Sequence, residues 1–153
     1  MRPYRDVAAI VGAQVICFFL LSHLEPDFFL MHLYQTVLYV ALLVLLFYME
    51  DRWAYMIGML ASVVWLGMAY SVGLLNSAVR HIARWDGNPV GYLAGATAVL
   101  AVLLIAACGR HWMKEYAGLG KALNTFLVSL GIVGVYYAIL VIWFWNRVPT
   151  TVG

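Results

Sequence analysis

Charged residues are scarce in this chain: Asp, Glu, Lys and Arg together make up 10% of its 153 residues. A soluble domain carries about 25% charged residues and about half apolar ones, whereas 65% of this sequence is hydrophobic. Too few polar side chains remain to cover so large an apolar core in water. The composition therefore excludes a water-soluble domain and predicts a protein solvated by lipid.

Strong net charge and paired cysteines are also lacking. The formal net charge is +2, and the sequence contains no basic run, so no nucleic-acid partner is indicated. The two cysteines, Cys17 and Cys108, lie in different apolar segments without Cys-x-x-Cys spacing. We expect one near mid-membrane and the other at a helix end, which is too far apart for a disulfide. Two free thiols are predicted.

Long apolar segments dominate what remains. A membrane-spanning helix needs roughly 17–25 apolar residues. Five segments reach this length without a single Asp, Glu, Lys or Arg: residues 7–24, 28–49, 53–79, 90–108 and 122–145. The sequence predicts an all-α, polytopic integral membrane protein, a bundle of five transmembrane helices. Residues 1–153 are expected to form a single transmembrane domain with no soluble domain.

The gaps between the segments predict the connections. Pro26 suits the first turn of a helix, where its missing N–H costs nothing, so the first two helices should form a tight hairpin. Asn76 and Ser77 should belong to the emerging end of the third helix. Residues 80–89 begin with an amphipathic stretch and end in an Asp-Gly-Asn-Pro turn. Residues 109–121 are expected to form the longest loop.

Lys and Arg are distributed unequally between the two predicted sides. One side carries six (Arg2, Arg5, Arg52, Arg110, Lys114 and Lys121) and the other carries three (Arg80, Arg84 and Arg147). The positive-inside rule then places the N-terminus in the cytoplasm and the C-terminus outside, in a bacterial inner (plasma) membrane.

Catalytic signals are missing as well. Ionisable side chains within a membrane are usually functional, and the five segments contain none apart from His, Cys and Tyr. This argues against a carboxylate-driven antiporter, a voltage sensor and an intramembrane aspartyl protease. Neither a Gly-x-Ser-x-Gly sequence nor a phosphate-binding loop is present. We do not expect an enzyme.

One polar stripe stands out in the second segment. His32, Gln35 and Tyr39 follow at i, i+3 and i+7 and so share a helix face, which should point into the bundle because lipid offers no hydrogen bonds. The first and last segments add further polar groups: Gln14, Ser22, Thr125, Ser129 and Tyr136. The stripe fits a pocket for a quinone-like molecule. It equally fits interhelical hydrogen bonds, each worth about 0.6 kcal/mol.

The histidines leave cofactor binding open. Imidazole and carboxylate are suitable ligands for zinc or copper, and His23, His32 and His81 should all lie near the outer surface. A haem shared by His23 and His32 would require ligands at matching depth, which the hairpin disfavours by the ~1.5 Å rise per residue. His81 remains a possible second haem ligand for His23 or for His32. The same histidine pattern also fits residues that are simply exposed to water at the membrane surface.

Small residues predict close helix contacts. They occur as Gly91-x-x-x-Gly95, as Gly58 with Ser62, and as Gly131 with Gly134. Such spacings let helix backbones approach in lipid, either within the chain or against a partner.

Taken together, the sequence favours a non-enzymatic integral membrane protein that is a small structural or assembly subunit of a larger membrane complex. Its partners would be the lipid bilayer and other membrane subunits, or further copies bound through small-residue helix faces. One alternative is a quinone-, haem- or metal-binding subunit that uses the His32–Gln35–Tyr39 stripe. Another is a small oligomeric carrier or channel.

Overall fold

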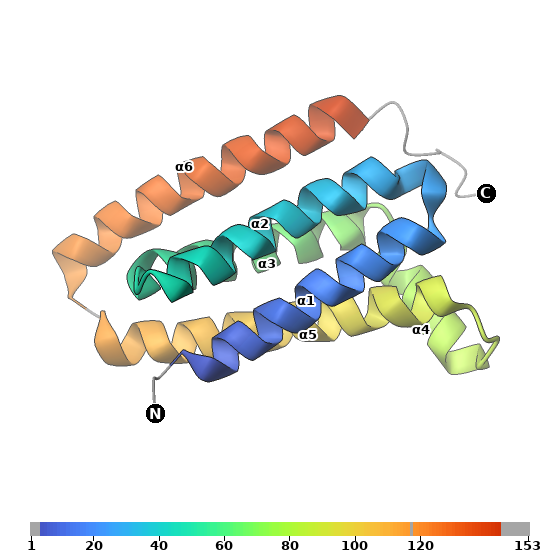
Figure 1. Cartoon of the computed structure of the whole chain (residues 1–153), viewed down its shortest axis with the longest axis horizontal. Coiled ribbons are helices and arrows are strands. Elements are labelled where there is room, and N and C mark those ends of the chain that lie inside the picture. Colours follow the sequence, from blue (N-terminus) through green and yellow to red (C-terminus); the bar gives the residue numbers. More distant parts are fainter. Residues whose placement is uncertain (1–3, 117, 145–153) are drawn as a thin grey trace.

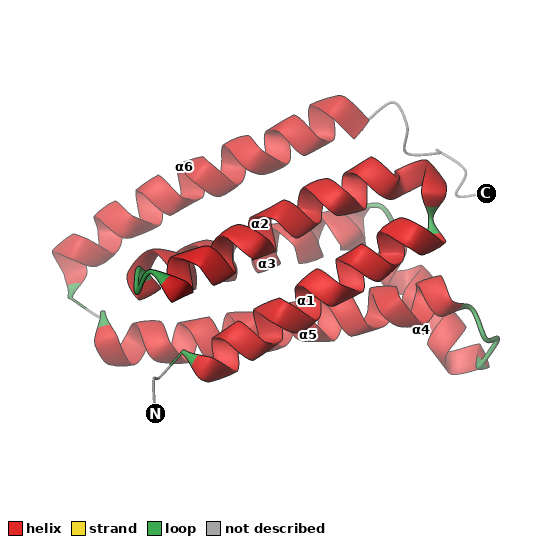
Figure 2. Cartoon of the chain, in the orientation of Figure 1, coloured by secondary structure: helices red, strands yellow, loops and turns green. Residues whose placement is uncertain are grey.

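The computed structural model describes residues 4–116 and 118–144, which form helices with no strand among them (Figures 1 and 2). Five helices are long and apolar enough to cross a membrane, which confirms the all-α, five-span prediction. The elements are α1 (Arg5–Leu24), the 3₁₀ turn η1 (Pro26–Phe28), α2 (Phe29–Phe47), α3 (Asp51–Ser71), α4 (Leu74–Arg84), α5 (Pro89–Glu115) and α6 (Leu119–Phe144). Residue 145, where the last predicted span ends, lies outside the described residues. So do Arg2 and Arg147, two of the nine Lys and Arg residues used to predict the orientation.

The long helices form an antiparallel bundle with two distinct ends (Figure 1). α1 packs between α2 and α5, while α3 contacts α2, α5 and α6. The start of α1, the α2–α3 turn and the end of α5 lie together at what we call the N-terminal end. The α1–α2 turn and α4 lie at the opposite end, which we call the α4 end.

The α1–α2 hairpin has the tight turn expected from Pro26. Glu25 leaves the helical conformation with φ −121° and ψ 77°, and its N–H still donates to Leu21 O at 2.9 Å. Pro26 then opens the 3₁₀ turn, where no backbone N–H is required. The chain reverses within four residues of Leu24 and enters α2.

The predicted third span, residues 53–79, is two helices. α3 ends at Ser71, and Gly73 adopts φ +76°, a left-handed conformation that favours glycine and redirects the chain. The following α4 is strongly amphipathic, with Asn76 and Arg80 exposed and Ala78 buried. Asn76 and Ser77 therefore belong to a separate helix rather than to the end of the third span, because their polar face cannot be placed in lipid.

The Gly91-x-x-x-Gly95 sequence is where α4 packs on α5. A β-carbon on Gly91 would lie 2.6 Å from His81 Cβ, and one on Gly95 would lie 2.6 Å from Ile82 Cδ1. Both glycines are therefore used for close packing within the chain.

α5 is longer than the predicted segment 90–108. Pro89 is its first residue, and the side chain of Asn88 accepts from the Val90 N–H at 3.1 Å, so the Asp-Gly-Asn-Pro turn caps the helix. At its other end the helix continues to Glu115, so the predicted loop over residues 109–121 is wrong. His111 and Trp112 are buried there, and their packing keeps these polar turns helical.

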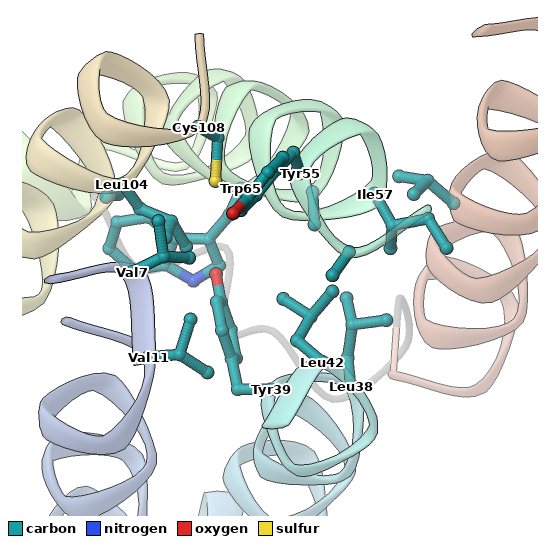
Figure 3. Close-up of a cluster of buried hydrophobic side chains, with 14 of the residues drawn as sticks. Val7, Val11, Leu38, Tyr39, Leu42, Tyr55, Ile57, Trp65, Leu104 and Cys108 are labelled. Atoms are coloured by element: carbon teal, nitrogen blue, oxygen red, sulfur yellow. The ribbon is translucent and has the colours of Figure 1, made fainter. Parts of the chain in front are cut away.

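The core lies where four helices converge (Figure 3). Val7 and Val11 of α1 meet Tyr39 of α2, Trp65 of α3 and Leu104 of α5, all at most 4% exposed. Both cysteines are free, as expected, and Cys108 Sγ would lie 3.4 Å from a β-carbon on Gly58. Gly58 thus lets α3 approach α5.

Gly91→Ala should destabilise the protein more than Gly95→Ala. The obstructing atom at Gly91 is His81 Cβ, which is fixed to the backbone, whereas Ile82 Cδ1 at Gly95 can rotate away. We expect a loss of about 1–3 kcal/mol for Gly91→Ala, measured by denaturant unfolding in mixed micelles. Equal losses for the two variants would contradict this packing.

Candidate functional site

The polar stripe of α2 faces the bundle interior, as predicted. His32 and Gln35 are each 6% exposed and Tyr39 is fully buried. The apolar side chains of α2 that face outward include Val37 and Val40, at 56% and 42% exposure. The apolar side of α2 therefore faces lipid, and the polar stripe contacts other helices of the protein.

His32 forms the end of the stripe next to the hairpin turn. Its Nε2–H donates to Glu25 Oε2 at 2.8 Å, so the side chain before Pro26 is tied to the start of α2. The Phe18 ring stacks against both His32 and Tyr39, with its centroid 6.5 Å from the His32 ring and 5.4 Å from the Tyr39 ring. The other imidazole nitrogen, Nδ1, is buried without a hydrogen-bond partner.

A central polar cluster surrounds Tyr39, formed by Gln14 of α1, Tyr39 of α2, Ser62 of α3 and Tyr137 of α6. The side chains of Gln14, Ser62 and Tyr137 lie beside the Tyr39 hydroxyl, and all four residues are at most 3% exposed. Gln14 Nε2–H donates to Thr97 O and Tyr137 O–H to Ala61 O, both at 3.3 Å. The cluster thus links α1 to α5 and α6 to α3.

Several polar atoms along this interior have no hydrogen-bond partner in the described structure. They are Gln14 Oε1, Gln35 Oε1, Tyr39 Oη and Ser62 Oγ, together with His32 Nδ1. Buried polar atoms are rarely left unpaired in proteins. The interior therefore holds hydrogen-bonding capacity beyond what the interhelical contacts use.

The remaining predicted polar residues serve other contacts. Ser22 Oγ–H donates to Phe19 O of its own helix at 2.6 Å, while Thr125 and Ser129 are buried on α6. Tyr136 stacks on Tyr34 with ring centroids 4.3 Å apart, and each hydroxyl donates to the other residue's backbone carbonyl. Sequence reasoning missed Tyr34, which precedes Gln35 and contacts α6 through Tyr136.

The three histidines proposed as metal ligands have separate surroundings. His23 is exposed on α1, with Nδ1 3.1 Å from Phe19 O, and His32 pairs with Glu25. His81, on α4, hydrogen-bonds to Asp86, and this bond together with the Asn88 N–H holds the pKa of Asp86 below its ordinary value. Nowhere in residues 4–116 and 118–144 do three His, Cys, Asp or Glu side chains gather in a way that could hold a metal ion.

A second polar cluster, which sequence reasoning missed, lies at the N-terminal end. Asp6 of α1 forms an ion pair with Arg110 and accepts from His111 Nε2–H at 3.0 Å. His111 Nδ1 lies 3.5 Å from Glu115, and the Tyr55 ring stacks on the imidazole at 5.2 Å. His111 and Glu115 are spaced i, i+4, which brings them together only on a helix, so the loop predicted over residues 109–121 conceals this pair.

The two ends and the centre differ in what they can do chemically. Each end has an imidazole hydrogen-bonded to a carboxylate, His32 to Glu25 at one end and His111 to Asp6 at the other. The centre has only amide and hydroxyl groups, which donate and accept hydrogen bonds without changing charge. The interior arrangement is therefore suited to joining helices and to binding a neutral hydrogen-bonding group.

Tyr137→Phe should destabilise the protein, whereas Tyr39→Phe should not. Both rings are buried, but the Tyr137 hydroxyl donates to Ala61 O, whereas the Tyr39 hydroxyl makes no hydrogen bond of ordinary geometry although Gln14, Ser62 and Tyr137 lie beside it. We expect a loss of about 0.6 kcal/mol for Tyr137→Phe, the average for such bonds in membranes, and no loss for Tyr39→Phe, measured by unfolding in mixed micelles. A larger loss for Tyr39→Phe would show that its hydroxyl is bonded.

Comparison of the chain with protein-family models, with curated proteins and with solved structures finds no match in any of the three.

Proposed function

We propose that this integral membrane protein is a non-enzymatic structural or assembly subunit, which another membrane protein contacts through the outer face of α6. The glycines of α6 carry the proposal. Nothing lies within 4 Å of the position of a β-carbon at Gly131 or Gly134. These two glycines are unused by the chain itself, unlike Gly91 and Gly95, which pack against α4.

The surroundings of α6 support a docking face. Over the described residues, α6 contacts only α3 and α2, and its other sides are open. Leu127, Gly131, Gly134 and Ala138 are all exposed and recur every three or four residues, so they form one outward stripe. Small residues in such a stripe allow a second helix to approach closely, which is how helices associate in lipid.

The interior supports a scaffold role. Three interhelical contacts tie the bundle together: Gln14 to Thr97, Tyr137 to Ala61, and the mutual Tyr34–Tyr136 pair. At the N-terminal end, Asp6 joins α1 to α5 through Arg110 and His111. Polar groups in the spans thus act largely as connections between helices. Because the connecting segments are short, recognition within the membrane is favoured.

A second candidate function rests on the unpartnered atoms of the stripe. His32 Nδ1, Gln35 Oε1 and Tyr39 Oη are buried and have hydrogen-bonding capacity to spare. A quinone carbonyl could accept from the Tyr39 hydroxyl, and the hydroxyl of the reduced quinol could donate to Gln35 Oε1 or His32 Nδ1. In either case we place the N-terminal end in the cytoplasm and the α4 end outside a bacterial inner membrane, from the bias of Lys and Arg.

Replacing both Gly131 and Gly134 by Leu should weaken association. Each new side chain would project from the outward stripe and hold a partner helix away, with no clash inside the chain. We expect the amount of partner that co-purifies in mild detergent to fall about tenfold, equivalent to about 1.4 kcal/mol.

Gly67→Leu is the matched control, since the position of its β-carbon on α3 is also open. It should leave the amount of co-purified partner unchanged.

An absorption spectrum of the purified protein tests the second candidate function, the binding of a quinone-like molecule. A protein that elutes without partners and carries a stoichiometric quinone would reject the scaffold role in favour of ligand binding.

A further inference from the structure

An apolar groove of about 500 Å³ lies between α2, α3 and α6. Its walls include Leu38, Ala41 and Leu45 of α2, Trp53 and Ile57 of α3, and Ile132 of α6. Figure 3 shows Leu38 and Ile57 at the edge of the core that is turned toward α6. The groove is within the range of about 300–1,000 Å³ that is typical of small-molecule sites.

The position of the groove follows from how α6 is attached. α2 and α6 are joined at the stacked Tyr34–Tyr136 pair. The groove follows α2 from Leu38 to Leu45, between this pair and the α2–α3 turn. Its floor is buried, as Leu38 and Ile57 are each 6% exposed, while Ile132 at its rim is 47% exposed. The groove therefore opens to the hydrocarbon region of the bilayer.

The lining determines what can occupy the groove. Every lining surface is apolar, so the walls offer dispersion contacts and no hydrogen bonds. A hydrocarbon chain satisfies this condition at any point along the groove. A polar or charged molecule would lose its hydration without compensation.

The end of the groove adds charge. The groove residues Leu45 and Trp53 flank the α2–α3 turn, where Glu50, Asp51 and Arg52 are consecutive. The Arg52 guanidinium lies over the Trp53 ring, 5.1 Å from its centroid, which places a cation directly at the groove wall. The Glu50 N–H donates to the backbone oxygen of the groove residue Leu45 at 2.9 Å, so an acidic residue lies at the same end of the groove. The Asp51 carboxylate lies instead toward His111 and Glu115 of α5.

This charge pattern matches a zwitterionic lipid headgroup. A phosphate would be attracted to Arg52 and an ammonium to Glu50. An anionic headgroup without an amine would be repelled by Glu50, and a cation without a phosphate would be repelled by Arg52. We propose that the groove binds an acyl chain of an amine-bearing zwitterionic phospholipid, with phosphate at Arg52 and the ammonium at Glu50. This lipid site does not depend on the association through α6.

Native mass spectrometry of the full-length protein tests the site. The protein would be purified in mild detergent and mixed with equal amounts of phosphatidylethanolamine, phosphatidylcholine and phosphatidylglycerol that carry identical acyl chains. We expect phosphatidylethanolamine to be retained preferentially. Ala41→Phe, which fills the groove, should reduce retention about tenfold, while the lipid-facing control Val99→Phe on α5 (60% exposed at Val99) should retain it.

The headgroup contacts require their own variants. Arg52→Gln should reduce retention of all three lipids, since each carries a phosphate. Glu50→Gln should reduce only the preference for phosphatidylethanolamine over phosphatidylglycerol. If Ala41→Phe fails to fold, as judged by thermal unfolding in the same detergent, Leu45→Trp provides a second way to fill the groove.

Three results would overturn the proposal. One is equal retention of the three lipids by the wild-type protein. Another is unchanged retention in a folded groove-filling variant. The third is a mass spectrum in which a quinone or a second copy of the chain is bound in place of the phospholipid.

Discussion

Lipid supplies no hydrogen bonds, and this constraint determines where each polar group of the molecule lies. The helices satisfy their own backbones, and side chains such as Gln14 and Tyr137 bond the carbonyl groups of neighbouring helices. Ion pairs lie at the bundle ends, where Asp6 meets Arg110 and Glu25 meets His32. The apolar surface of the helices is left for lipid or for another protein.

The same constraint explains what sequence could predict. Because the spans exclude all formal charge, hydropathy and charge together locate five helices and the Pro26 hairpin. The inward orientation of His32, Gln35 and Tyr39 also follows, since a polar stripe on an apolar helix has only one favourable direction. These predictions depend on periodicity along one helix, which a sequence displays directly.

Features that depend on contacts between helices could not be predicted in this way. α3 ends just before Gly73, within a stretch that has no charged residue, so charge does not mark a boundary there. The helical turns around His111 are stabilised by burial and by contact with Asp6, far away in sequence. Equally, no local pattern distinguishes Gly91, which packs on His81, from Gly131, which faces open space.

The attachment of α6 has a consequence for how the chain assembles. α1, α2, α3 and α5 form a ring in which each helix contacts two others, and α6, which follows them in the chain, adds only to α2 and α3 among the described elements. Membrane helices insert individually before they pack side by side. The first spans can therefore form a complete bundle early, and α6 joins it as a late addition. Until that moment, the side of α3 that receives α6 is open to whatever helix reaches it first.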